Sequence, residues 1–145
     1  MSNRRTTQSI SQKILQNNLR EITDLLDNMI STEETNLTNM MRTANIHRQH
    51  RQMVLRLERM LERLQRIDQL LNAYLAVVVH RIRPQIESRR IQQAYHIFHD
   101  SNIWQQYPSI VRTERYRLTE LSNRLNELQL QVRHVIFYLR SVSSR

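Results

Sequence analysis

Apolar side chains recur along two stretches of the chain at alternating steps of three and four residues. Such a repeat averages about 3.5 residues per turn, so each set forms one apolar stripe along a helix and requires a second helix against it. The central seam consists of Leu57, Met60, Leu64, Ile67, Leu71, Tyr74 and Val78. The C-terminal seam consists of Leu118, Leu121, Leu125, Leu128, Val132, Val135, Leu139 and Val142. The pattern predicts an all-α protein whose two long, heptad-patterned helices form an elongated helical bundle or a coiled-coil hairpin.

Two very long helices and a shorter first helix are expected from the apolar stripes, in a fold of four or five helices. The central seam predicts a helix over residues 46–83, and the C-terminal seam predicts a helix over residues 109–142. A shorter stripe near the N-terminus predicts a first helix over residues 11–30. Its apolar face is formed by Leu15, Leu19, Ile22, Leu26 and Met29.

The polar residues after the first helix leave two outcomes open. Ser31 and Glu34 have the spacing of a capping box, which would start a new helix at this point. Alternatively, the first helix continues without a break through Met41, because this stretch contains neither proline nor glycine.

Pro84 predicts a bend after the central helix, because proline disfavours helical geometry at the residue before it. Proline suits the first turn of a helix, so a short helix is expected over residues 84–99. The polar residues 100–102 predict a loop, and an apolar cluster of Ile103, Trp104 and Tyr107 follows it. Residues 70–79 are apolar on nearly all sides of the helix, so we expect them in the middle of a bundle or assembly.

One α-helical domain is expected over residues 11–142, between a disordered or fraying basic arm at residues 1–10 and a fraying tail at residues 143–145. The polar N-terminus lacks the apolar core of a secretory signal. The longest apolar run, residues 70–79, is about half of the roughly 20 residues that cross a bilayer. We therefore expect an intracellular protein of the cytoplasm or nucleus, or a virion component, that is neither secreted nor membrane-spanning.

The absence of glycine and cysteine from the 145 residues removes several classes of site. Glycine-rich phosphate loops need backbone geometry that other residues avoid, and disulfides, thiol nucleophiles and cysteine-based zinc sites need cysteine. Two histidine pairs are spaced three residues apart, His47 with His50 and His96 with His99, but neither has a third ligand in a known pattern. We therefore predict a non-enzymatic protein with no metal, no cofactor and no small-molecule substrate.

The formal net charge is +9, and almost all of the positive charge is arginine because Lys13 is the only lysine. Arginine binds carboxylates and phosphates through two parallel hydrogen bonds. The arginine stripe of the central helix consists of Arg48, Arg51, Arg56, Arg59, Arg63 and Arg66. It predicts contact with nucleic-acid phosphates or with an acidic partner protein, and both interpretations stay open. A basic helix leading into a seam is typical of basic-zipper proteins, but the asparagine and alanine positions of that family are not in place.

Several smaller interactions are also expected. The i,i+4 spacing predicts ion pairs between Glu62 and Arg66 and between Glu120 and Arg124. Asp68 is expected to form an interface salt bridge. The aromatic pairs Trp104–Tyr107 and Phe137–Tyr138 have the composition of base-stacking platforms, although packing into the core is the interpretation we favour.

The seams together predict a structural or assembly subunit that binds protein partners, or copies of itself, as a homo- or hetero-oligomer. The alternative is a nucleic-acid-associated protein of chromatin, of replication or of a virion that contacts phosphates through the arginine stripe. A membrane partner is not expected, because no helix pairs the basic residues with an aromatic, lipid-facing side.

Overall fold

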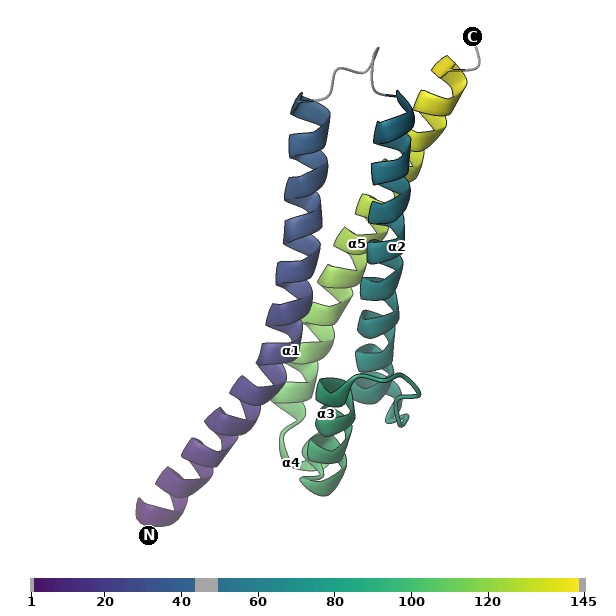
Figure 1. The fold of residues 1–145 in the computed structure, drawn as a ribbon. Helices are drawn as coiled ribbons and strands as arrows, with labels where there is room; N and C mark the ends of the chain where they lie inside the picture. The colour runs from purple at the N-terminus through teal and green to yellow at the C-terminus, as the bar shows by residue number, and fades with distance from the viewer. Residues whose placement is uncertain (1, 44–49, 144–145) are drawn as a thin grey trace.

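A computed structural model describes the backbone of residues 2–43 and 50–143, and the side chains of residues 12–42 and 50–142. Three long helices dominate it: α1 (Ser2–Thr43), α2 (His50–Leu75) and α5 (Pro108–Ser143). In Figure 1, α1 and α2 run antiparallel and α5 crosses them at an angle. The short helices α3 (Arg89–Asp100) and α4 (Ile103–Gln106) lie at the end where α2 finishes and α5 begins. The described residues contain no strand, so the all-α prediction is confirmed.

The polar stretch after residue 30 continues α1 and does not start a new helix. The Thr32 and Thr38 hydroxyls donate hydrogen bonds to carbonyl oxygens four residues earlier, at 2.7 Å to Asn28 and 3.0 Å to Glu34. These side chains therefore lie along the helix and do not cap one. The same helix begins at Ser2, so the backbone of residues 2–10 extends α1 where a separate arm was expected.

The central helix is shorter than predicted. α2 ends at Leu75 and passes into a π-helical turn, η1 (Ala76–His80), after which Arg81 takes the left-handed conformation at φ 57°. The predicted extension of the helix to residue 83 is therefore wrong, because the chain leaves helical geometry at Arg81, before it reaches Pro84. The next helix begins at Arg89 and not at Pro84, since the Ser88 hydroxyl accepts a hydrogen bond from the Ile91 amide (3.4 Å) and caps it.

Two tight turns use the left-handed backbone conformation that glycine usually supplies, but with other residues. Arg81 makes one, and Asn102 at φ 49° makes the turn between α3 and α4, within the loop predicted at residues 100–102. The Trp104 indole Nε1–H donates a hydrogen bond of 2.8 Å to the Val78 carbonyl, which lies in η1. The Arg81 guanidinium stands 4.9 Å from the centroid of the same indole ring. Trp104 is half-buried, as the packing interpretation predicts.

The central seam is buried along its whole length, with each of its side chains at most 2% exposed. The C-terminal seam is buried except at Val135, which is half-buried while Ile136 takes its place, and at the half-buried Val142. A similar one-residue shift occurs in α1, where Ile30 is buried and Met29 is half-buried. On an ideal α-helix, the line of residues in a strict heptad repeat rotates around the helix axis by about 20° per repeat. An extra step of four residues brings the apolar line back against the crossing helix.

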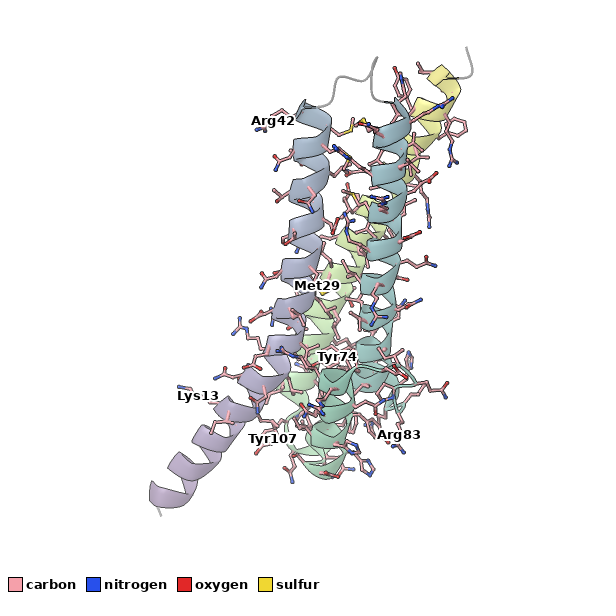
Figure 2. The ribbon with its side chains drawn as sticks, viewed as in Figure 1. Lys13, Met29, Arg42, Tyr74, Arg83 and Tyr107 are labelled. Atoms are coloured by element: carbon pink, nitrogen blue, oxygen red, sulfur yellow. The ribbon has the colours of Figure 1, made fainter. Side chains whose placement is uncertain are left out.

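The two seams are covered by helices of the same chain. α2 contacts α5 more extensively than any other pair of elements does, and α1 contacts both. Every apolar residue of the segment 70–79 is buried or half-buried, with α3 and α5 against η1. The seam residues, Tyr74 among them (Figure 2), are thus packed against helices of the same chain, and the exposed side chains lie outside the seams.

Candidate protein-interaction surfaces

An exposed apolar patch lies on the outer face of α5, toward its C-terminal end. The side chains of Leu130, Phe137 and Tyr138 are 58%, 75% and 57% exposed, and we name them the α5 patch. The prediction that Phe137 and Tyr138 pack into the core is wrong. Ile136 and Leu139 point inward, so the two residues between them turn outward on a helix of 3.6 residues per turn.

The carboxylates of α1 and α2 are largely used in ion pairs between helices. Arg124 of α5 donates to Asp27 and to Glu34, each at 2.6 Å, and Arg63 of α2 binds Glu33 through two hydrogen bonds of 2.7 and 3.1 Å. The other pairs between helices are Arg117–Asp24 and Arg140–Glu58. Hydrogen bonds to Glu34 and Asp27 raise the pKa of Arg124 above its usual value.

The ion pairs predicted within single helices are not formed among the described residues. Arg124 pairs with α1 instead of Glu120, which accepts a hydrogen bond from Tyr116 and raises the pKa of that phenol. Asp68 accepts a hydrogen bond of 3.2 Å from the Asn72 amide and forms no ion pair with a described residue, so its interface salt bridge stays a prediction. Carboxylates of α1 reach Arg124 across the interface between the helices, and i,i+4 spacing within α5 gives no sign of them.

The residues of the arginine stripe differ in whether they form an ion pair. Arg63 is held by Glu33, and Arg48 lies outside the described residues. The remaining side chains are exposed and form no ion pair with any described residue: Arg51, Arg56, Arg59 and Arg66. These four guanidinium groups remain available to an anionic partner.

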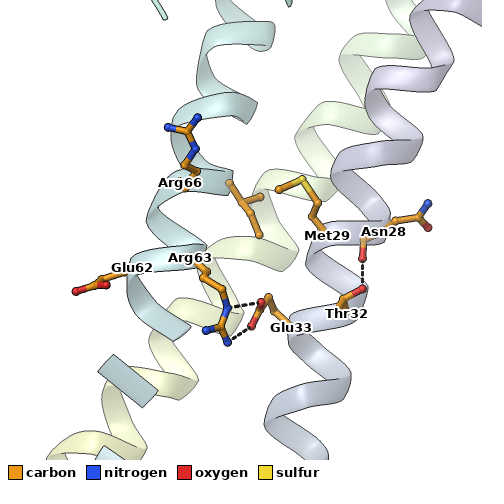
Figure 3. Close-up of a pocket in the computed structure, with 8 residues that line it drawn as sticks. Asn28, Met29, Thr32, Glu33, Glu62, Arg63 and Arg66 are labelled. Atoms are coloured by element: carbon orange, nitrogen blue, oxygen red, sulfur yellow. Dashed lines mark hydrogen bonds and ion pairs between the residues drawn. The ribbon is translucent and has the colours of Figure 1, made fainter. Parts of the chain in front are cut away.

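A groove of about 500 Å³ runs between α1 and α2 beside this stripe. Figure 3 shows Met29 pointing from α1 toward α2 and the Arg63–Glu33 pair joining the two helices below it. The buried Ile67 side chain of the central seam lines the same groove. Most of the exposed lining is therefore hydrocarbon. The only sign of this groove in the sequence is that the apolar residues Met29 and Ile30 are adjacent. In the structure the apolar stripe of α1 shifts to Ile30 here, and Met29 is left half-buried beside the groove.

No protein-family model matches the chain, and no match was found among the curated proteins or the solved structures compared with it. Function is therefore inferred from the surfaces themselves. The α5 patch and the groove between α1 and α2 are on different helices, so they are two separate surfaces.

A polar cluster is enclosed where α1, α2 and α5 meet. Glu114 is 2% exposed, and its Oε2 has no hydrogen-bond partner among the described residues, while its Oε1 lies 3.7 Å from the Arg117 guanidinium. Burial raises the pKa of the Glu114 carboxyl, and Arg117 and Thr23 oppose that rise. Burial also raises the pKa of the Tyr74 phenol, which donates a hydrogen bond of 3.3 Å to the Leu19 carbonyl. The sequence carries one signal of this cluster, since Glu114 lies four residues before Leu118 in the register of the seam.

The histidine pairs do not come together with further ligands in the described part of the chain. No group of three or more histidine, aspartate or glutamate side chains there is placed to hold a metal ion. His47 lies outside the described residues, and His99 stacks on Tyr95 with ring centroids 5.9 Å apart. Among the described helices, none combines the length and the apolar composition needed to cross a membrane.

Proposed function

We propose that this chain is a non-enzymatic structural or assembly subunit that binds protein partners, or copies of itself, through exposed helical faces. The observation that carries the proposal is the α5 patch, because exposed aromatic and aliphatic side chains grouped on one face are typical of protein-binding surfaces. Large aromatic side chains contribute much contact area at little cost in rotamer freedom, and they dominate binding energy at interfaces.

The position of the patch supports this role. Leu130 and Phe137 are seven residues apart, so they lie on the same line along α5, and Tyr138 lies beside them. The last turns of α5 diverge from α1 in Figure 1, and the three side chains of the patch remain exposed among the described residues. We propose that α2 and α5 form a coiled-coil-like hairpin that presents the patch on a rigid helix.

Sedimentation velocity at micromolar concentrations tests the proposal. The wild-type protein is expected to associate, and the double variant Phe137→Ser, Tyr138→Ser is expected to sediment as a monomer with unchanged helical circular dichroism. Tyr116→Ser is the matched control, because Tyr116 is 65% exposed on the same helix but lies outside the patch. It is expected to associate like the wild type.

A constitutive complex with another protein requires a second measurement. Affinity purification from the native source, followed by mass spectrometry, is expected to recover partners that the double variant loses and the Tyr116→Ser control keeps. A wild-type protein that is monomeric throughout and recovers no patch-dependent partner contradicts the proposal.

A further inference from the structure

We infer that the groove between α1 and α2 binds an acidic amphipathic helix of a partner protein. This inference is independent of the α5 patch, since it depends on a different pair of helices. Three features carry it: an apolar floor, unpaired guanidinium groups along the α2 side, and an α1 side whose exposed residues are uncharged.

The floor of the groove suits an apolar helix face better than a small molecule. The exposed lining is mostly hydrocarbon, with the half-buried Met29 and the buried Ile67 at its floor, and the groove lies open along the surface between two antiparallel helices. Small-molecule sites bury most of the ligand, which an open groove does not do. A helix laid along two others buries its own apolar stripe against theirs, as in helix-in-groove recognition.

The α2 rim is positively charged. Arg59 and Arg66 are seven residues apart and therefore lie on one line along α2, and Arg56 lies one turn before them. None of the three forms an ion pair with a described residue. Glu62 also lines the groove from α2, with its carboxylate pointing away from α1 in Figure 3.

The exposed residues of the α1 rim are uncharged, because the carboxylate of Glu33, which also lines the groove, is buried and paired with Arg63 of α2. Asn28, Thr32 and Asn36 are exposed along this side of α1 at successive turns. The acidic residues Asp27 and Glu34 lie on the other side of the helix, where Arg124 of α5 binds both. A helix in the groove therefore meets guanidinium groups along one edge and neutral amides and hydroxyls along the other.

This asymmetry favours an acidic helix over nucleic acid. Phosphate binding gains little from an apolar floor, because it depends on neutralising the backbone charge with lysine and arginine. An amphipathic helix with glutamate or aspartate along one edge uses both the floor and the stripe. Arg56 to Arg66 spans about 15 Å at 1.5 Å per residue, which corresponds to roughly three helical turns of the partner.

A peptide selection against the full-length protein tests the inference. The probe is a library of 18-residue helical peptides with leucine at the heptad core positions and glutamate, lysine or glutamine randomised at the flanking positions. Selection on the wild type is expected to enrich glutamate along one edge. The best peptide is expected to lose at least tenfold in affinity against Arg59→Glu, Arg66→Glu, measured by fluorescence anisotropy. Selection on that variant is expected to enrich lysine instead.

Matched controls separate the groove from the general charge of the protein. Arg112→Glu, Arg115→Glu makes the same charge change at exposed positions of α5 and is expected to leave binding unchanged. Thr32→Glu places a negative charge on the neutral rim and is expected to weaken binding at least fivefold. Thr38→Glu is not expected to weaken it, because Thr38 is exposed one turn after Glu34, on the other side of α1.

Three outcomes overturn the inference. The first is a selection that yields no binder, or binders poor in glutamate. The second is a glutamate-rich binder that is indifferent to Thr32→Glu. The third is duplex DNA or RNA of 20 base pairs that binds in 50 mM salt and is lost with Arg59→Glu, Arg66→Glu while no peptide competes for the site. The oligomeric state of the α5 variants does not enter this test.

Discussion

At the scale of single residues, Glu114 is the most unusual side chain of the interior. It occupies a core position of α5 in the register of the seam, yet one of its carboxylate oxygens lacks a partner among the described residues. A buried polar atom without a hydrogen bond costs about 1–3 kcal/mol. Arg117 and Thr23 offset part of this cost, and burial still raises the pKa of the carboxyl. The folded protein therefore holds this proton more tightly than the unfolded chain does.

The substitution Glu114→Gln is expected to stabilise the protein at neutral pH by on the order of 1 kcal/mol, because it removes the buried charge and keeps the shape. The pKa of Glu114 is higher in the folded state than its ordinary value of 4.5, so wild-type stability falls as pH rises through the folded pKa. The advantage of the variant is thus largest above the folded pKa and shrinks as pH falls toward 4.5.

Urea denaturation at several pH values measures this difference. Glu127→Gln, at an exposed position of the same helix, serves as the control and is expected to follow the wild type at every pH. A difference between Glu114→Gln and the wild type that does not change with pH contradicts the proposed origin of the effect.

At the scale of helices, the packing depends on where the spacing of buried residues in each apolar stripe is four where the heptad has three. α5 moves from Val132 to Ile136 in one step of four, and α1 moves from Leu26 to Ile30 in the same way. Helices that cross at an angle contact each other over a limited length, so the buried line follows the straight helix and not the heptad. The step also determines that Phe137 and Tyr138 face outward.

Two neighbouring alanine substitutions test this register. Ile136→Ala is expected to destabilise the protein by about 2–4 kcal/mol, because it removes a buried side chain and leaves a cavity. Val135→Ala is expected to cost about 1 kcal/mol or less, since Val135 is half-buried. Chemical denaturation measures both free energies of unfolding. Equal costs, or a larger cost for Val135→Ala, would show that the strict heptad holds instead.

At the scale of the whole molecule, the core and the candidate binding surfaces are separate. The seams are covered by the chain's own helices, and the carboxylates of α1 mostly pair with arginines of α2 and α5. The α5 patch and the unpaired part of the arginine stripe remain on the outside. Stability and partner binding are therefore expected to respond to different substitutions.

Leu125 and Leu130 distinguish the two properties on one helix. Leu125 is fully buried, so Leu125→Ala is expected to cost about 2–5 kcal/mol of unfolding free energy. Leu130 is 58% exposed, so Leu130→Ala is expected to change stability by less than about 0.5 kcal/mol while weakening association. Denaturation at low concentration and sedimentation velocity measure the two effects. Association that survives Leu130→Ala unchanged would exclude this residue from the interface.

The predictability of the interaction surfaces differed from that of the core. The central seam was predicted at every position, because the repeat of apolar residues identifies one face of a helix without knowledge of its neighbour. The groove was not predicted, because Met29, Thr32 and Ile67 come from two helices. The sequence of neither helix shows that the two pack side by side. Arg63 was grouped with the arginine stripe for the same reason, because its partner Glu33 is 30 residues away.

The sequence by itself determined the helical class, the buried line of α2, most of that of α5 and the turn near Asn102. Each of these follows from local periodicity or from the backbone preference of a few adjacent residues. Only the tertiary structure decided that the seams pair within one chain, that α2 ends before Pro84, and that Phe137 and Tyr138 face outward. These outcomes depend on the angle at which helices cross and on contacts between distant segments, and periodicity along one helix contains neither.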